Sequence, residues 1–144
     1  ILLVDDDLFA MDSYVRALQE TGMRMDVYED AAEGLGAFLK NPGDWTCAIL
    51  DVMMSVPTEG WEEDQGEGQT TGLTLAKKIR VARSDLPIVF LTNNRDGSVL
   101  QEVRQFSKPS KYVDKREARP EEFVRTIQEM ATISTATTER SENA

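Results

Sequence analysis

Five short apolar segments alternate with stretches of helical spacing, and this alternation restricts the fold more than any other feature of the chain. The segments cover residues 1–4, 25–28, 47–50 and 87–91, and a weaker one covers 111–113. They are continuous apolar runs, which are typical of parallel strands covered on both faces. The sequence therefore predicts strands and helices that follow one another in turn along the chain.

The intervening segments have apolar residues at helical intervals. Leu8, Met11, Val15 and Leu18 form one such stripe. Four further helices are predicted, over 31–39, around 73–79, over 97–106 and from 120 to 130. With right-handed crossovers, this order predicts an α/β fold: a doubly wound five-stranded parallel sheet in the flavodoxin-like order 2-1-3-4-5, with helices on both faces.

Two segments lie outside this pattern. Residues 55–70 contain five acids, three glycines and no basic residue, so we expect an acidic insertion between the third strand and the third helix that stays outside the fold. Trp61 within it is either an anchor for a partner or packs back onto the domain. The main domain is expected over 1–131, with 132–144 as a C-terminal helix extension, tail or linker.

Composition excludes several classes of function. The net charge of −10 argues against binding of nucleic acid by this domain, because phosphate backbones attract a basic surface. No apolar run is long enough to span a membrane. The chain has no His and one cysteine, Cys47, which excludes a Cys/His metal site. No signal peptide is recognisable, and we expect a cytoplasmic protein.

Acidic residues follow two strands that are neighbours in the predicted sheet. Asp5, Asp6 and Asp7 come after the first strand, and Asp51 comes directly after the third. Clustered carboxylates repel one another unless a cation lies among them, and a ligand set of oxygens favours Mg²⁺. The alternative is that these acids only begin loops, with Asp6 or Asp7 capping the next helix.

Two further side chains follow the remaining strands. Thr92 follows the fourth strand, and Lys115 follows the fifth. A hydroxyl and an ammonium beside a carboxylate–metal centre are suited to the oxygens of a phosphoryl group. Taken singly, Thr92 is better explained as a turn residue and Lys115 as a solvated surface lysine. Their combination with the acids is the informative observation.

These residues resemble the receiver domains of two-component response regulators. The motifs that carry the resemblance are Val4-Asp5-Asp6, Leu50-Asp51-Val52-Met53-Met54, Leu91-Thr92, and Tyr112 followed by Lys115. They occur in the same order as in that family, and the resemblance extends from residue 1 to about 131.

The resemblance implies a role for each matching residue. Asp51 would be the phosphoacceptor, and a Mg²⁺ ion would be held by Asp5, Asp6, Asp51 and the backbone carbonyl of Met53. Thr92 would be the switch hydroxyl, Tyr112 the aromatic residue that turns inward in the active state, and Lys115 the lysine that contacts Asp51 and then phosphate.

The implied partner is a sensor histidine kinase or phosphotransfer protein. An effector domain or downstream protein would then respond to the surface formed by the fourth helix, fifth strand and fifth helix, and a homodimer is possible. Such a domain is a signalling switch and no enzyme beyond its own phosphorylation and dephosphorylation.

The chain departs from the family pattern at several positions. Ser55 stands where a proline is usual, Asn93 where a small residue is usual, and Arg116 where a proline usually follows the lysine. A Lys108-Pro109 pair offers an alternative lysine, although Lys115 leaves room for both the fourth helix and the fifth strand. The insertion also lengthens the usual connection by about a dozen residues.

Two other functions remain open at this point. One is a receiver-like interaction module that is never phosphorylated, with the acidic insertion as its contact surface. The other is a Mg²⁺-dependent phosphohydrolase with an aspartate nucleophile. That enzyme needs a second aspartate two residues after the first as its acid and base, and Met53 occupies this position.

Overall fold

The computed structural model describes residues 1–61, 68, 70–93 and 97–142, with side chains described as far as residue 133. Its strands are β1 (Leu2–Val4), β2 (Asp26–Tyr28), β3 (Ala48–Asp51), β4 (Ile88–Thr92) and β5 (Ser110–Asp114). Its helices are α1 (Asp12–Glu20), α2 (Ala31–Lys40), the short 3-10 helix η1 (Pro42–Asp44), α3 (Thr71–Ala82), α4 (Gly97–Gln105) and α5 (Pro120–Glu142).

The five strands form one parallel sheet in the order β2-β1-β3-β4-β5, which confirms the predicted fold. Val4 pairs with Leu50, and Leu50 pairs with Phe90 across the centre of the sheet. Because β3 lies between β1 and β4, the residues at the carboxyl ends of these three strands are brought together.

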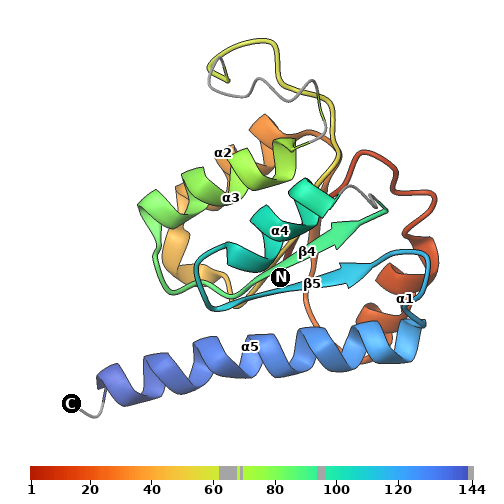
Figure 1. Ribbon diagram of the computed structural model, residues 1–144. Helices are drawn as coiled ribbons and strands as arrows, with labels where there is room; N and C mark the ends of the chain where they lie inside the picture. Colours follow the sequence, from red (N-terminus) through yellow and green to blue (C-terminus); the bar gives the residue numbers. More distant parts are fainter. Residues whose placement is uncertain (62–67, 69, 94–96, 143–144) are drawn as a thin grey trace.

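Helices cover both faces of the sheet (Figure 1). One buried cluster packs α2, α3 and α4 against alternate strand residues such as Leu50 and Phe90, and the other packs α1 and α5 against residues such as Ile49 and Val89. Cys47 belongs to the second cluster, and its burial raises the pKa of the thiol to about 12. Cys47 is therefore a buried, free thiol of the core.

The first helix begins later than its apolar stripe predicts. Leu8 and Met11 lie in a turn, in which the Met11 N–H donates to the Leu8 carbonyl, and α1 begins at Asp12. Asp7 accepts a hydrogen bond from the Ala10 N–H within this turn. Met11 and Leu18 are buried, and Leu8 and Val15 are half-buried against the same cluster. The spacing therefore identified the residues that face the core but not the start of the helix.

The last helix extends well past the domain body. Phe123, Ile127 and Met130 face the core, and the helix continues to Glu142 (Figure 1). Residues 132–142, for which an extension, tail or linker is predicted, are thus helical in the structure.

The acidic insertion is attached to the core through Trp61. This side chain is 5% exposed and belongs to the cluster that packs α2, α3 and α4. The Lys78 ammonium lies 4.9 Å from the centre of its ring. Of the two alternatives for Trp61, packing back onto the domain is therefore the one that the structure shows. The large apolar surface of this side chain outweighs the acidic character of its neighbours. The acids Glu62, Glu63, Asp64 and Glu67 lie outside the described residues.

Gly72 allows the start of α3 to approach the end of β3. The Gly72 N–H donates to the Val52 carbonyl at 3.0 Å, and an added Cβ would lie 2.7 Å from the Val52 Cα and closer still to the Asp51 carbonyl oxygen. Backbone atoms cannot move aside as a flexible side chain does. This position therefore requires the smallest residue.

We expect Gly72→Ala to lower the free energy of unfolding by about 2 to 3 kcal/mol, because the extra methyl group forces α3 away from β3. Urea denaturation would measure this change. Gly36→Ala in α2 is the matched control: its Cβ would meet no atom within 4 Å, so it should stabilise the protein by up to about 1 kcal/mol. Equal effects of the two substitutions would contradict the steric argument.

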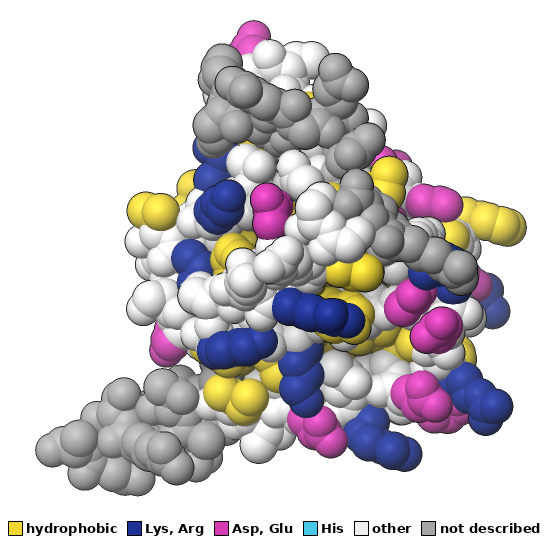
Figure 2. Space-filling model, in the orientation of Figure 1, with side chains coloured by type: hydrophobic (Ala, Val, Ile, Leu, Met, Phe, Trp, Pro, Cys, Tyr) yellow, Lys and Arg dark blue, Asp and Glu magenta, His cyan; other side chains and the backbone are white. Residues whose placement is uncertain are grey.

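Charged side chains of both signs lie on the surface of the described residues. On the face shown in Figure 2, which looks onto α4, β4 and β5, acidic and basic side chains are interspersed. Within the described residues, no helix is both long enough and apolar enough to cross a membrane.

Candidate functional site

Three carboxylates meet at the carboxyl ends of β1 and β3. Asp5 and Asp6 follow β1, Asp51 ends β3, and one oxygen of each lies within 4.8 Å of the others. Asp5 and Asp51 are buried, whereas Asp6 is exposed to solvent. The register of β1 beside β3 produces this cluster, as the sequence predicts.

Lys115 inserts its ammonium between two of these carboxylates. Its Nζ atom lies 2.7 Å from Asp5 Oδ2 and 3.3 Å from Asp51 Oδ2. Lys108, the alternative lysine, precedes β5 and donates instead to the Ser110 carbonyl. The structure thus places Lys115 in the acidic cluster, as the register of the predicted fifth strand requires.

Burial and charge perturb the ionisation of this cluster. Burial, followed by repulsion from Asp5, raises the pKa of Asp51 from 3.8 to about 7, although Lys115 opposes the shift. Burial lowers the pKa of Lys115, but its contacts with Asp5 and Asp51 outweigh this effect and raise the pKa above its ordinary value. A carboxyl group with a strongly raised pKa beside a fixed ammonium is typical of a functional site.

The backbone around the carboxylates is fixed by hydrogen bonds. The Asp7 N–H donates to Asp5 Oδ1 at 2.8 Å, and the Ser55 N–H donates to Asp6 Oδ2 at 3.3 Å. Asp7 therefore supports Asp5 and is not placed in the three-carboxylate cluster. The first residue of the insertion contacts the exposed carboxylate, so the insertion begins at the edge of the site.

The three remaining predicted residues occupy different places. Thr92 is buried at the carboxyl end of β4, and its carbonyl accepts a hydrogen bond from the Lys115 N–H. Tyr112 lies on β5 with 38% of its surface exposed, and its hydroxyl accepts a hydrogen bond from Arg104 Nη2 at 2.9 Å. The Met53 side chain is 42% exposed. A metal-ligand role for the Met53 carbonyl stays a prediction.

The cluster fits a hard divalent cation. All three side chains offer carboxylate oxygens, and Asp6 is open to solvent. Asp5 Oδ2 is buried and accepts no well-directed hydrogen bond among the described residues, although the Lys115 ammonium lies close to it. Oxygen ligands with room for water are the coordination that Mg²⁺ prefers.

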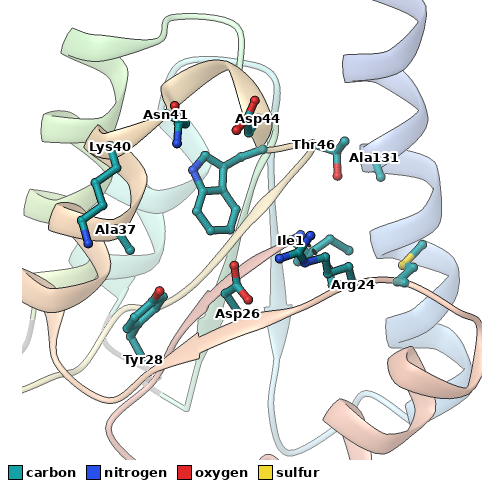
Figure 3. A pocket seen from close by; sticks show the side chains of 12 residues that line it. Ile1, Arg24, Asp26, Tyr28, Ala37, Lys40, Asn41, Asp44, Thr46 and Ala131 are labelled. Carbon is teal, nitrogen blue, oxygen red and sulfur yellow. Dashed lines mark hydrogen bonds between the residues drawn. The ribbon is translucent and has the colours of Figure 1, made fainter.

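A separate pocket lies beside the edge strand β2, next to the end of α2 and the segment before β3 (Figure 3). Its volume is about 590 Å³, and Asp26, Tyr28, Lys40 and Trp45 are among its lining residues. The Trp45 Nε1 atom is buried and has no hydrogen-bond partner among the described residues. None of the residues with a predicted role lines this pocket, so it is not the site that the sequence indicates.

Sequence reasoning missed Tyr14, whose hydroxyl contacts the turn that carries Lys115. The Tyr14 hydroxyl lies 2.6 Å from the Ala118 carbonyl and 3.2 Å from the Lys115 carbonyl. These partners are more than 100 positions away along the chain. No local pattern reveals a contact of this kind.

Comparisons with known proteins agree with this geometry. The sequence profile of the response regulator receiver domain matches residues 1–128. Over 92 residues, the chain is 35% identical to transcriptional regulatory protein RprY of Bacteroides fragilis and 32% identical to response regulator MprA of Mycobacterium sp. strain KMS. Both alignments cover 64% of this chain, and they cover 33% and 34% of those proteins. The chain thus spans about a third of the length of these curated relatives.

Solved structures share the fold at lower identity. A CheY-like receiver domain protein from Methanospirillum hungatei superposes with a TM-score of 0.69 at 20% identity, covering 94% of this chain and 95% of that one. NtrX from Brucella abortus, solved with ADP, gives a TM-score of 0.73 at 18% identity, covering 99% of this chain and 29% of that one.

Proposed function

Because the chain belongs to the response regulator receiver family, we propose that it accepts a phosphoryl group on Asp51 in a Mg²⁺-dependent reaction. One observation carries the proposal: Asp51 ends the central strand within reach of two further carboxylates and 3.3 Å from the Lys115 ammonium. A carboxylate nucleophile, a metal-binding acid pair and a cation are the groups that phosphoryl transfer requires.

Each group of the site has a separate role in the proposed reaction. An Asp51 oxygen attacks phosphorus, forming the acyl phosphate bond as the bond between phosphorus and the donor atom breaks. The Lys115 ammonium and the Thr92 hydroxyl then contact the oxygens of the transferred group. The metal, held by Asp5, Asp6, Asp51 and the Met53 carbonyl, would neutralise the remaining negative charge.

The reaction has a defined beginning and end. The donor would be a phosphohistidine on a sensor histidine kinase or phosphotransfer protein, and a small acyl phosphate would serve as a substitute. Water would later hydrolyse the acyl phosphate and return Asp51 to its carboxylate form. The domain acts only on itself in this cycle, so we propose a cytoplasmic switch and no enzyme with a separate substrate.

Output would pass through α4, β5 and α5. Arg104 on α4 donates to the Tyr112 hydroxyl on β5, and its guanidinium lies 5.3 Å from the Tyr112 ring centre. An inward rotation of Tyr112 would break both contacts and change this surface. The similarity to RprY, a transcriptional regulatory protein, supports an effector domain as the recipient of this change, and the same surface would serve a downstream protein or a second copy.

Incubation with Mg²⁺ and acetyl phosphate tests the function directly. We expect intact-mass spectrometry to show the gain of one phosphoryl group and chelation of the metal to prevent it. The receiver-like module that is never phosphorylated predicts no gain in either case, which would overturn the proposal. The chain departs from the family pattern at Ser55, Asn93 and Arg116. These departures are the reason to test phosphorylation against the module that is never phosphorylated.

A further inference from the structure

We infer that Tyr14 is a positioning residue for Lys115, an inference that rests on the proposed function for its kinetic consequences. Tyr14 lies on α1, and its hydroxyl reaches the turn between β5 and α5 that carries Lys115. Among the described residues, the hydrogen-bond partners of its hydroxyl are the Lys115 and Ala118 carbonyls and no carboxylate. Its effect on the reaction must therefore pass through the lysine.

The turn after β5 depends on hydrogen bonds for its shape. The Arg116 N–H donates to Asp114 Oδ1, and the Glu117 and Ala118 N–H groups donate to the Asp114 carbonyl. The Lys115 N–H donates to the Thr92 carbonyl. Residue 116 is an arginine, so no proline ring restricts the backbone immediately after the lysine.

Tyr14 on α1 binds two backbone carbonyls of this turn through its hydroxyl. The Tyr14 hydroxyl donates to the Ala118 carbonyl at 2.6 Å, and the Lys115 carbonyl lies 3.2 Å away on the same hydroxyl. The hydroxyl has one hydrogen, which is donated mainly to the nearer Ala118 carbonyl. This hydrogen bond closes the turn at Ala118 and keeps the Lys115 carbonyl close to the Tyr14 hydroxyl.

The Tyr14 ring is itself fixed against α5. It packs edge to face on Phe123, with the ring centres 5.1 Å apart, and Phe123 is buried. A hydroxyl on a fixed ring can define the position of a backbone carbonyl. It thereby orients the Lys115 side chain, whose ammonium must remain between Asp5 and Asp51.

Tyr14→Phe tests this role because it removes the hydroxyl and leaves the ring. Tyr28→Phe, on β2 and away from this turn, makes the same chemical change as a matched control. The first measurement is the ¹H–¹³Cε NMR signal of Lys115, assigned by its loss in Lys115→Arg. We expect Tyr14→Phe to move this signal towards those of exposed lysines and Tyr28→Phe to leave it in place.

The second measurement is the rate of phosphoryl gain from acetyl phosphate. Loss of one neutral hydrogen bond should slow it by about 3- to 10-fold. In a Lys115→Ala background, Tyr14→Phe should have no further effect, since its influence passes through the lysine.

The outcomes separate this inference from the proposed function. An unchanged Lys115 signal, or the same fold reduction in both backgrounds, would overturn the positioning role. If the unmodified protein gains no phosphoryl group, the proposed function fails, and the NMR comparison alone decides the role of Tyr14.

Discussion

Asp51→Asn should abolish the phosphoryl gain, with a loss of more than about 100-fold, because an amide does not act as the nucleophile that a carboxylate provides. Asp51 is the residue at the end of the central strand that faces both Asp5 and Lys115. Intact-mass spectrometry after incubation with acetyl phosphate and Mg²⁺ would measure the loss. Asp44→Asn in η1, at the other end of the sheet, should gain one phosphoryl group as the unmodified protein does. A full gain in Asp51→Asn would assign the acceptor to another residue.

The same substitution should stabilise the metal-free protein at alkaline pH. The pKa of Asp51 is about 7 in the fold, against 3.8 as its ordinary value, so ionisation favours the unfolded chain. Below about pH 4 the Asp51 carboxyl is protonated in both the folded and the unfolded chain, and it does not lower the free energy of unfolding. The free energy of unfolding then falls as the pH rises from about 4 through 7. A difference of one in the pKa of Asp51 between the folded and unfolded chain corresponds to about 1.4 kcal/mol in the free energy of unfolding.

Asp51→Asn removes this ionisation. We therefore expect the variant to exceed the unmodified protein in free energy of unfolding by about 2 to 4 kcal/mol at pH 8, and by little near pH 4. Urea denaturation at the two pH values would measure the difference. Mg²⁺ should stabilise the unmodified protein more than the variant, and a difference independent of pH would contradict the electrostatic explanation.

Trp61→Ala should lower the free energy of unfolding by about 3 kcal/mol, because it removes a buried aromatic side chain from the core. Trp61 is 5% exposed and packs in the cluster beneath α2, α3 and α4. Urea denaturation followed by circular dichroism would measure the change. A loss below about 1 kcal/mol in the free energy of unfolding would indicate that Trp61 does not belong to the core. The whole insertion would then be a solvated surface segment, as its composition predicts.

Lys78→Met provides the control for the Trp61 prediction. Lys78 lies over the Trp61 ring and donates to the Gly60 carbonyl at 3.5 Å. Methionine keeps most of the apolar contact and removes the charge, so the expected loss is about 0.5 to 1 kcal/mol. Replacing residues 55–70 by a short turn should cost at least as much stability as Trp61→Ala, which reverses the expectation from the sequence.

The parts of the molecule that follow a repeated pattern were predictable from the sequence. Continuous apolar runs predict buried parallel strands, and the residues that follow such strands necessarily meet at one edge of the sheet. Asp5, Asp51 and Lys115 are each adjacent to a strand end, so their convergence follows from topology alone. Their roles in phosphoryl transfer follow from family membership and stay proposals.

The parts that depend on individual tertiary contacts were not predictable. The acids around Trp61 indicate a solvated loop, and only the fold shows an apolar surface that accepts the indole. The Tyr14 hydroxyl finds its carbonyl partners more than 100 residues away. The pocket around Trp45 combines strand starts with the end of α2. Each of these contacts requires the completed packing of helices on the sheet.

The part of α5 that extends past the core would amplify a small tilt of this helix. The last residue of this helix known to be buried against the core is Met130, and the helix continues to Glu142. At 1.5 Å per residue, the remaining part projects by roughly 18 Å. A tilt of α5 by roughly 10° would carry its far end through about 3 Å, while residues beside the sheet move by a fraction of that distance. A spectroscopic label near the end of α5 would therefore register a tilt of this helix that a label placed over the core would miss.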